Sequence, residues 1–263
     1  MSDHDRIGYI ITGHTGGIGK ELAAHALRGG HKVVGIARSN LKDQKQSYAQ
    51  INFSEVQCDF SRLEGNMLSR EQLGVIDEAL IDCSKIVYIL NAGQNHSPDY
   101  AAVEMLDTVV KLLTVNAIAQ LKLLGELLTH RTNMVDKCIF IGSYLTFLNS
   151  SHTSIGYVLS KNILQELTLR YQEQTNSSLR LQTIVLGGVY TSMNRQEQID
   201  KNSIRSWLGK LFRLSPEQAA RSIIKASELN SPIKFIPALP ALPVSVLYYG
   251  RVFLRSLFYL FRR

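Results

Sequence analysis

Residues 12–19 of the chain, TGHTGGIG, lie between a short apolar run at 7–12 and an amphipathic segment that ends at Gly29–Gly30. The run predicts a buried β-strand and the segment predicts a helix, so the glycines fall in a tight strand-to-helix turn. Because glycine has no side chain, the backbone can turn sharply and approach a pyrophosphate at the helix N-terminus. A glycine-rich turn in this position is typical of the first βα unit of a dinucleotide-binding sheet.

The rest of the chain alternates strands and helices with a spacing of about 30 residues, which favours βαβ units. The sequence therefore predicts an α/β fold with a Rossmann-type doubly wound parallel sheet, as a single domain over 1–235 followed by a tail at 236–263. The third strand is expected to end at Asp59. Further strands are predicted at 31–38, 51–60, 85–93, 137–143, 179–189 and 233–239, and helices at 75–81, 101–129, 154–167 and 215–228.

The formal charge of +7 is concentrated near the C-terminal end. Residues 231–263 contain five lysines and arginines and no acid, which leaves +2 for the rest of the chain. We therefore expect no nucleic-acid partner, since such binding needs a basic face. Cys58, Cys83 and Cys138 are widely spaced without a CxxC pair, so no disulfide framework or metal site is expected. With no signal peptide at the start, this indicates a reducing cytoplasm.

The end of the second strand bears on the choice of cofactor. Proteins that bind NAD usually place an Asp or Glu there to accept from the ribose 2′-hydroxyl. Here the strand ends at Ala37 and is followed by Arg38 and Ser39. A guanidinium can bind a 2′-phosphate in a forked geometry, which favours NADP(H). The alternative interpretation is a solvated loop arginine.

Tyr157 and Lys161 lie four residues apart in a segment with helical periodicity, so they share one face of the helix. A lysine ammonium beside a phenol favours the phenolate and lowers the pKa of the tyrosine. Such a pair can pass a proton near neutral pH. The pair alone would also fit an ordinary exposed Tyr/Lys contact.

Taken together, these motifs resemble the short-chain dehydrogenase/reductase family over about residues 6–230. The resemblance depends on TGHTGGIG, on CDF at 58–60, NAG at 91–93 and YVLSK at 157–161, and on Asn116 and Ser143 between them. It implies a catalytic tetrad of Asn116, Ser143, Tyr157 and Lys161. In it Tyr157 is the general acid, Lys161 lowers its pKa and holds the nicotinamide ribose, Ser143 polarises the carbonyl, and Asn116 kinks its helix and holds a proton-relaying water.

The resemblance also implies the cofactor site. Asp59 would bond the adenine edge, and Asn91–Gly93 would lie along the adenosine ribose. The family's Pro-Gly pair after the sixth strand is replaced by Leu186–Gly187, and Ser143 precedes Tyr157 by one residue more than usual, which we assign to the loop at 149–154. The expected cofactor-binding residues are Gly13, Thr15, Gly17, Ile18, Gly19, Arg38, Ser39, Asp59, Phe60, Asn91, Ala92, Gly93, Tyr157, Lys161, Gly187, Val189 and Thr191.

Residues 192–214 are the expected substrate lid, with one apolar and one basic side. This composition suits an apolar ketone with an anionic handle, such as a 3-oxoacyl compound, and equally a solvated amphipathic helix packed on the domain. His14, His96 and His152 fall in predicted loops and are expected to be polar surface without a role.

The tail at 244–263 carries four arginines, no acid, and many aromatic and aliphatic residues. We expect peripheral contact with the inner face of a membrane; a helix docked on another subunit or over the substrate pocket is the alternative. The predicted function is an NADP(H)-dependent oxidoreductase acting on a small-molecule carbonyl or alcohol, as a homo-oligomer (dimer or tetramer). The alternatives are a silent NADP(H)-binding sensor and a nucleotide-sugar-modifying enzyme. The complete tetrad disfavours the sensor, and chain length and glycine spacing disfavour the sugar-modifying enzyme.

Overall fold

The structure is a computed structural model that describes residues 6–39, 52–95, 102–130, 135–147, 155–174, 178–191, 193 and 213–238. Most of the predicted lid at 192–214 lies outside these residues. The tail at 244–263, the loop at 149–154, His96 and His152 lie wholly outside them.

Seven strands form one sheet in the order β3-β2-β1-β4-β5-β6-β7, and each pairs in parallel with its neighbours. This confirms the predicted doubly wound α/β fold. The order reverses between β1 and β4, and the carboxyl ends of strands at such a reversal flank a ligand crevice. The strands are β1 Ile7–Thr12, β2 Lys32–Ala37, β3 Phe53–Gln57, β4 Lys85–Leu90, β5 Val135–Ser143, β6 Arg180–Leu186 and β7 Ile233–Ile236.

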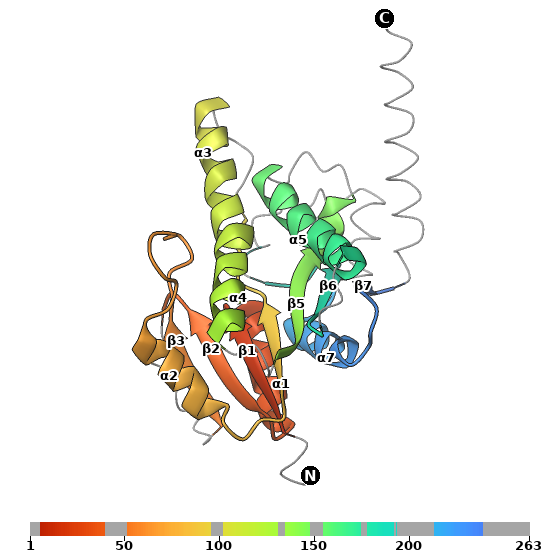
Figure 1. The fold of residues 1–263 in the computed structure, drawn as a ribbon. Helices are drawn as coiled ribbons and strands as arrows, with labels where there is room; N and C mark the ends of the chain where they lie inside the picture. Colours follow the sequence, from red (N-terminus) through yellow and green to blue (C-terminus); the bar gives the residue numbers. More distant parts are fainter. Residues whose placement is uncertain are drawn as a thin grey trace, which may run out of the picture.

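Helices cover both faces of the sheet (Figure 1). α2, α4 and α5 pack on one face, where Tyr88 and Phe140 are fully buried; α1 and α7 pack on the other, where Ile11 and Leu22 are fully buried. The two hydrophobic layers explain why the central strands are apolar on both sides. The helices are α1 Gly17–Arg28, α2 Arg70–Ala79, α3 Ala102–Leu113, α4 Ala119–His130, α5 Ile155–Gln174 and α7 Pro216–Ser227.

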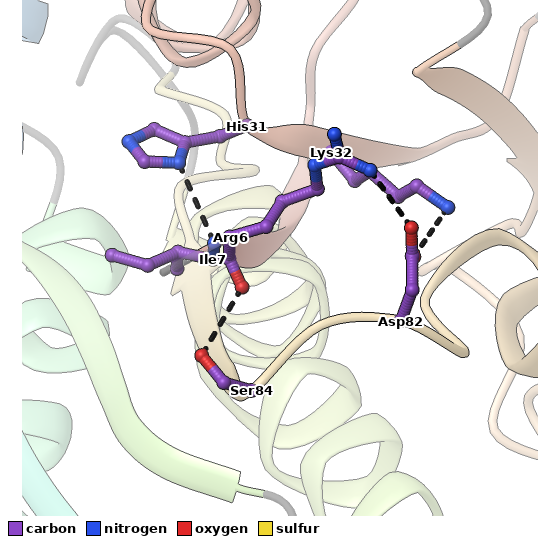
Figure 2. A network of polar contacts seen from close by, with 6 residues as sticks. All are labelled: Arg6, Ile7, His31, Lys32, Asp82 and Ser84. Carbon is purple, nitrogen blue, oxygen red and sulfur yellow. Dashed lines mark hydrogen bonds and ion pairs between the residues drawn. The ribbon is translucent and has the colours of Figure 1, made fainter. Parts of the chain in front are cut away.

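A polar network joins the amino ends of the strands (Figure 2). The Asp82 carboxylate binds Nη1 of Arg6 at 2.8 Å and Nζ of Lys32 at 2.5 Å. Nδ1 of His31 accepts from the first backbone N–H of β1, and burial lowers the pKa of His31, which favours the unprotonated ring that an acceptor requires. These contacts lie at the edge of the sheet opposite to the carboxyl ends.

β3 ends at Gln57, so the predicted strand end at Asp59 is wrong by two residues. Oδ1 of Asp59 accepts from the backbone N–H of Ser61 at 3.0 Å and from its hydroxyl at 2.8 Å. A side-chain bond to the backbone two residues on turns the chain. This turn ends the strand.

The helix predicted over 101–129 contains a π-helical turn, η3, at Thr114–Ile118. The N–H of Ala119 donates to the carbonyl of Thr114, five residues back. π-helical turns inside α-helices are frequent at functional sites. Asn116 lies at the centre of this turn, where the resemblance implies a kink.

Within the described residues, one helix, Met105–His130, has the length and apolar composition to cross a membrane. Core helices of globular domains meet the same criteria. Leu112, Leu123 and Leu127 of this helix are fully buried, and Leu123 and Leu127 belong to the hydrophobic layer under the sheet. We interpret the helix as part of the core.

Candidate active site

A cavity of about 740 Å³ opens at the carboxyl ends of the strands, and its volume suits a small-molecule ligand. The predicted site residues that line it come from seven segments of the chain. Gly19 and Asn116 are the two predicted residues that do not line it. The lining residues are Gly13, Thr15, Gly17, Ile18, Arg38, Ser39, Asp59, Phe60, Asn91, Ala92, Gly93, Ser143, Tyr157, Lys161, Gly187, Val189 and Thr191.

The glycine-rich turn is packed so tightly that side chains would not fit at two of its positions. Gly13 has φ +70°, and a Cβ there would lie 2.9 Å from Cα of Ala92. A Cβ on Gly19 would lie 2.2 Å from the carbonyl oxygen of Gly13. The first turn of α1 contains no acidic residue, so its N-terminus presents backbone N–H groups without a competing charge. This arrangement fits the pyrophosphate of a dinucleotide.

Thr12 joins the glycine-rich turn to the end of β4. Its Oγ1 accepts from the backbone N–H groups of Asn91 and Ala92, both at 2.9 Å, and donates to Oε1 of Gln120 at 3.0 Å. Nδ2 of Asn91 donates back to the carbonyl of Thr12 at 3.1 Å. Thr12 and Gln120 are not among the site residues expected from the sequence. A polar residue within an apolar helical stripe was the available signal for Gln120.

The end of the cavity that is expected to hold adenosine is formed by the ends of β2 and β3. Ala37 is buried, whereas Arg38 is exposed and its carbonyl accepts from Nε2 of Gln57 at 2.8 Å. Hydrogen bonds from Ser61 lower the pKa of Asp59, so this carboxylate is ionised at neutral pH. Among the described residues, this end of the cavity therefore has the cation Arg38 and the anion Asp59, while β2 ends at Ala37 and not at an acidic residue.

The reactive end of the cavity brings Ser143 of β5 together with Tyr157 and Lys161 of α5. Nζ of Lys161 lies 5.7 Å from the centroid of the Tyr157 ring, as the four-residue spacing predicted. Lys161 is 4% exposed, and burial lowers its pKa to about 8. Oγ of Ser143 accepts from the N–H of Leu145 at 3.2 Å, which leaves its own proton free to be donated.

Asn116 braces the loop after β4. Its Oδ1 accepts from the N–H of Gln94 at 2.7 Å, and its Nδ2 donates to the carbonyl of Gln94 at 2.9 Å and to Oγ of Ser160 at 3.2 Å. A Cβ on Gly93 would lie 3.4 Å from Oδ1 of Asn116 and 3.6 Å from Nζ of Lys161. The side chain thus reaches the neighbourhood of Lys161 while fixing a cavity-lining loop.

Lys161 leads to a prediction for the protein without cofactor. Its pKa falls from 10.5 to about 8 on burial, so between these values the unfolded chain binds more protons. Stability should therefore rise with pH, by about 1 kcal/mol between pH 7 and 9 from this group alone. Urea unfolding at both pH values measures this gain. Lys161→Met should lack it, and identical pH slopes in the two proteins would contradict the lowered pKa.

The segment after β6 is held in place although Leu186 replaces the family's proline. The N–H of Gly187 donates to the carbonyl of Ile236 at 2.8 Å, and Val189 forms a parallel bridge with Leu214. Thr191 contacts the glycine-rich turn, because a Cβ on Gly17 would lie 3.3 Å from its Cγ2. Backbone hydrogen bonds therefore position this wall of the cavity.

His14 is not polar surface, so that prediction is wrong. Its side chain is fully buried and its Nε2 lies 2.6 Å from Oε1 of Glu55. The sequence offered no local signal, because the partner lies on another strand.

Comparisons with known proteins agree with this geometry. Residues 9–202 match the family described as short chain dehydrogenase. No match was found among curated proteins. A short chain dehydrogenase/reductase from Burkholderia phymatum in complex with NAD has a TM-score of 0.69 at 16% identity, over 97% of each chain. The RhlG/NADP complex of Pseudomonas aeruginosa has a TM-score of 0.66 at 19% identity, over 89% of this chain and 95% of that one.

A serine dehydrogenase complexed with NADP+ has a TM-score of 0.64 at 18% identity, over 87% of this chain and 93% of that one. At these identities the solved structures show a common fold. The family match extends over most of the chain and includes the glycine-rich turn and all four tetrad positions. The chain therefore belongs to the short chain dehydrogenase family.

Proposed function

We propose that the protein is an NADP(H)-dependent oxidoreductase that transfers a hydride between the nicotinamide and a carbonyl or secondary alcohol. The observation that carries this proposal is that Ser143, Tyr157 and Lys161 share one cavity with the glycine-rich turn. A dinucleotide at the turn and a carbonyl beside Tyr157 would then occupy one continuous space.

The nicotinamide, when bound, supplies the hydride for reduction. Ser143 donates a hydrogen bond to the carbonyl oxygen, and Tyr157 donates the proton that this oxygen takes up. Lys161 stabilises the resulting phenolate, and its pKa of about 8 allows it to hold or release a proton near neutral pH. In the oxidative direction the phenolate accepts the proton of the alcohol.

The preference for NADP(H) is supported by Arg38 and by Ala37 in the position where an acid would bind the ribose of NAD. Ser39 lines the cavity beside Arg38 and offers a hydroxyl to the same phosphate. The related structures contain both cofactors, NAD in one and NADP in two others. The proposed preference for NADP(H) is therefore argued from Ala37, Arg38 and Ser39 of this chain and not from the related structures.

The substrate end supports an apolar ketone with an anionic group, such as a 3-oxoacyl compound. Tyr144, Leu145 and Met193 line the cavity, together with the cations Lys111 and Arg213. Among the described lining residues the acid is Asp59, at the adenosine end. A carboxylate or phosphate on the substrate would therefore meet positive charge.

The test is NADPH oxidation, followed by absorbance, with paired ketones that differ only in a carboxylate. Turnover that is faster with the acidic member of each pair is the expected result. The alternative is a sensor. It would be indicated if the wild-type protein and Tyr157→Phe both bind NADPH and neither turns over any ketone.

The tail at 244–263 is expected to attach a cytoplasmic homo-oligomer to the inner face of a membrane, because arginines beside aromatic residues suit an anionic lipid surface. The full chain should sediment with anionic vesicles but not with neutral ones, and a chain ending at residue 243 should sediment with neither. If the full chain ignores anionic vesicles and truncation splits an oligomer, the tail is a subunit contact.

A further inference from the structure

We propose that His14 and Glu55 form a buried clamp that positions the glycine-rich turn for cofactor binding. The inference rests on the proposed function, because it requires a nicotinamide dinucleotide at the turn. His14 does not line the cavity, but its neighbours Gly13 and Thr15 do. His14 is therefore a positioning residue that acts through the turn.

The sheet is shaped to receive the His14 ring. A Cβ on Gly35 of β2 would lie 2.5 Å from Cγ of His14, so the ring lies directly over a glycine. Phe53 of β3 packs against the ring, with centroids 5.8 Å apart and planes at 58°. Glu55 pairs with Gly35 across the two strands, which places its side chain beside the ring. Three positions on two strands thus accommodate one residue of the turn.

The polar contact is short and shielded from water. Nε2 of His14 lies 2.6 Å from Oε1 of Glu55, and the two side chains are 0% and 9% exposed. A hydrogen on Nε2 can be donated to the carboxyl oxygen of Glu55. Among the described residues Nδ1 of His14 has no hydrogen-bond partner, which leaves the bond to Glu55 as the polar restraint on the ring.

The clamp completes the attachment of the turn. The N–H of Gly13 donates to the carbonyl of Ile36 on β2 at 2.8 Å, and Thr12 is bonded to the segment after β4. A Cβ on Gly16, at the outer part of the turn, would meet nothing within 4 Å. His14 anchors this outer part to β3, 41 residues away in the sequence. Without the anchor the N–H groups that face a pyrophosphate would have to be ordered by the ligand, which weakens binding.

The test measures the Kd of NADPH and of NADH by cofactor fluorescence with the full chain. His14→Ala should weaken both by about tenfold, because the pyrophosphate is common to them. Gly35→Ala should do the same, since its new Cβ displaces the ring and leaves both partners present. His14→Gln keeps an N–H donor and should restore most of the affinity. At saturating cofactor, kcat and the ketone KM should stay within about twofold of wild type, which separates positioning from a general loss of structure.

The matched control is Asp77→Asn, which alters a surface pair in which Nε2 of His130 lies 2.7 Å from Oδ2 of Asp77. It should leave both Kd values unchanged. If the wild-type protein binds neither cofactor, the proposed function fails. The clamp is wrong if the wild-type protein binds the cofactors and His14→Ala and Gly35→Ala have the same Kd values as the wild-type protein. The clamp is also wrong if these variants weaken the binding of NADPH but not of NADH. If His14→Ala does not fold, Glu55→Leu, which keeps a similar size and removes the acceptor of the bond to His14, decides between the same outcomes.

Discussion

Tyr157→Phe should lower kcat by about 10²–10⁴-fold, the usual contribution of a positioned general acid. Phenylalanine keeps the ring beside Nζ of Lys161, at 5.7 Å from the centroid, but has no proton to donate to the carbonyl oxygen. The Kd of NADPH should change little, because the ring and the buried lysine both remain. Steady-state NADPH oxidation with a ketone that the wild-type protein reduces measures kcat, and cofactor fluorescence measures the Kd.

Tyr144→Phe is the control, because Tyr144 is a second tyrosine in the same cavity. Its hydroxyl donates to the carbonyl of Pro237 at 2.6 Å, and burial raises its pKa to about 12. Both features make it a poor proton donor to a substrate. If Tyr144→Phe loses turnover and Tyr157→Phe keeps it, then Tyr144 and not Tyr157 is the general acid.

Arg38→Asp should abolish the cofactor preference. The wild-type protein should bind NADPH at least about tenfold more tightly than NADH, a difference of about 1.4 kcal/mol. An aspartate would repel the 2′-phosphate and accept from the 2′-hydroxyl of NADH. Since Arg38 is exposed and its carbonyl is held by Gln57, the change should leave the backbone in place.

Arg62→Asp is the matched control for Arg38→Asp. Arg62 is also exposed and lies near the same carboxylate, with Nε 3.7 Å from Oδ2 of Asp59, but it does not line the cavity. Fluorescence titration with both cofactors should give an unchanged ratio of Kd values in this variant. Equal Kd values in the wild-type protein would show that Arg38 does not select NADP(H).

Most of the fold and the location of the site could be predicted from the sequence because they depend on local patterns. Apolar runs followed by helical periodicity define each βα unit, and glycine spacing marks the first turn. Ser143 falls at the end of a strand, and Tyr157 and Lys161 share a helix face because their spacing matches the helical repeat. In the structure all three line the same cavity.

Where local signals were weak, the predictions were less accurate. The π-helical turn at Thr114–Ile118 lies within a continuous helical pattern that does not mark the extra residue, and Asn116 at its centre bonds the distant residues Gln94 and Ser160. The end of β3 was placed at Asp59 because the apolar pattern continues to Phe60. The side chain of Asp59 turns the chain instead.

Local patterns in the chain were enough to predict the alternation of strands and helices, the glycine-rich turn and the face shared by Tyr157 and Lys161, because each is a property of residues close together in the chain. The contacts that hold the glycine-rich turn in place could be seen only in the folded structure. Thr12 bonds Gln120 across 108 residues, and His14 bonds Glu55 across 41. Such bonds depend on strand register and on the space left by residues such as Gly35, and a buried polar group pairs with whatever the packed fold brings within reach.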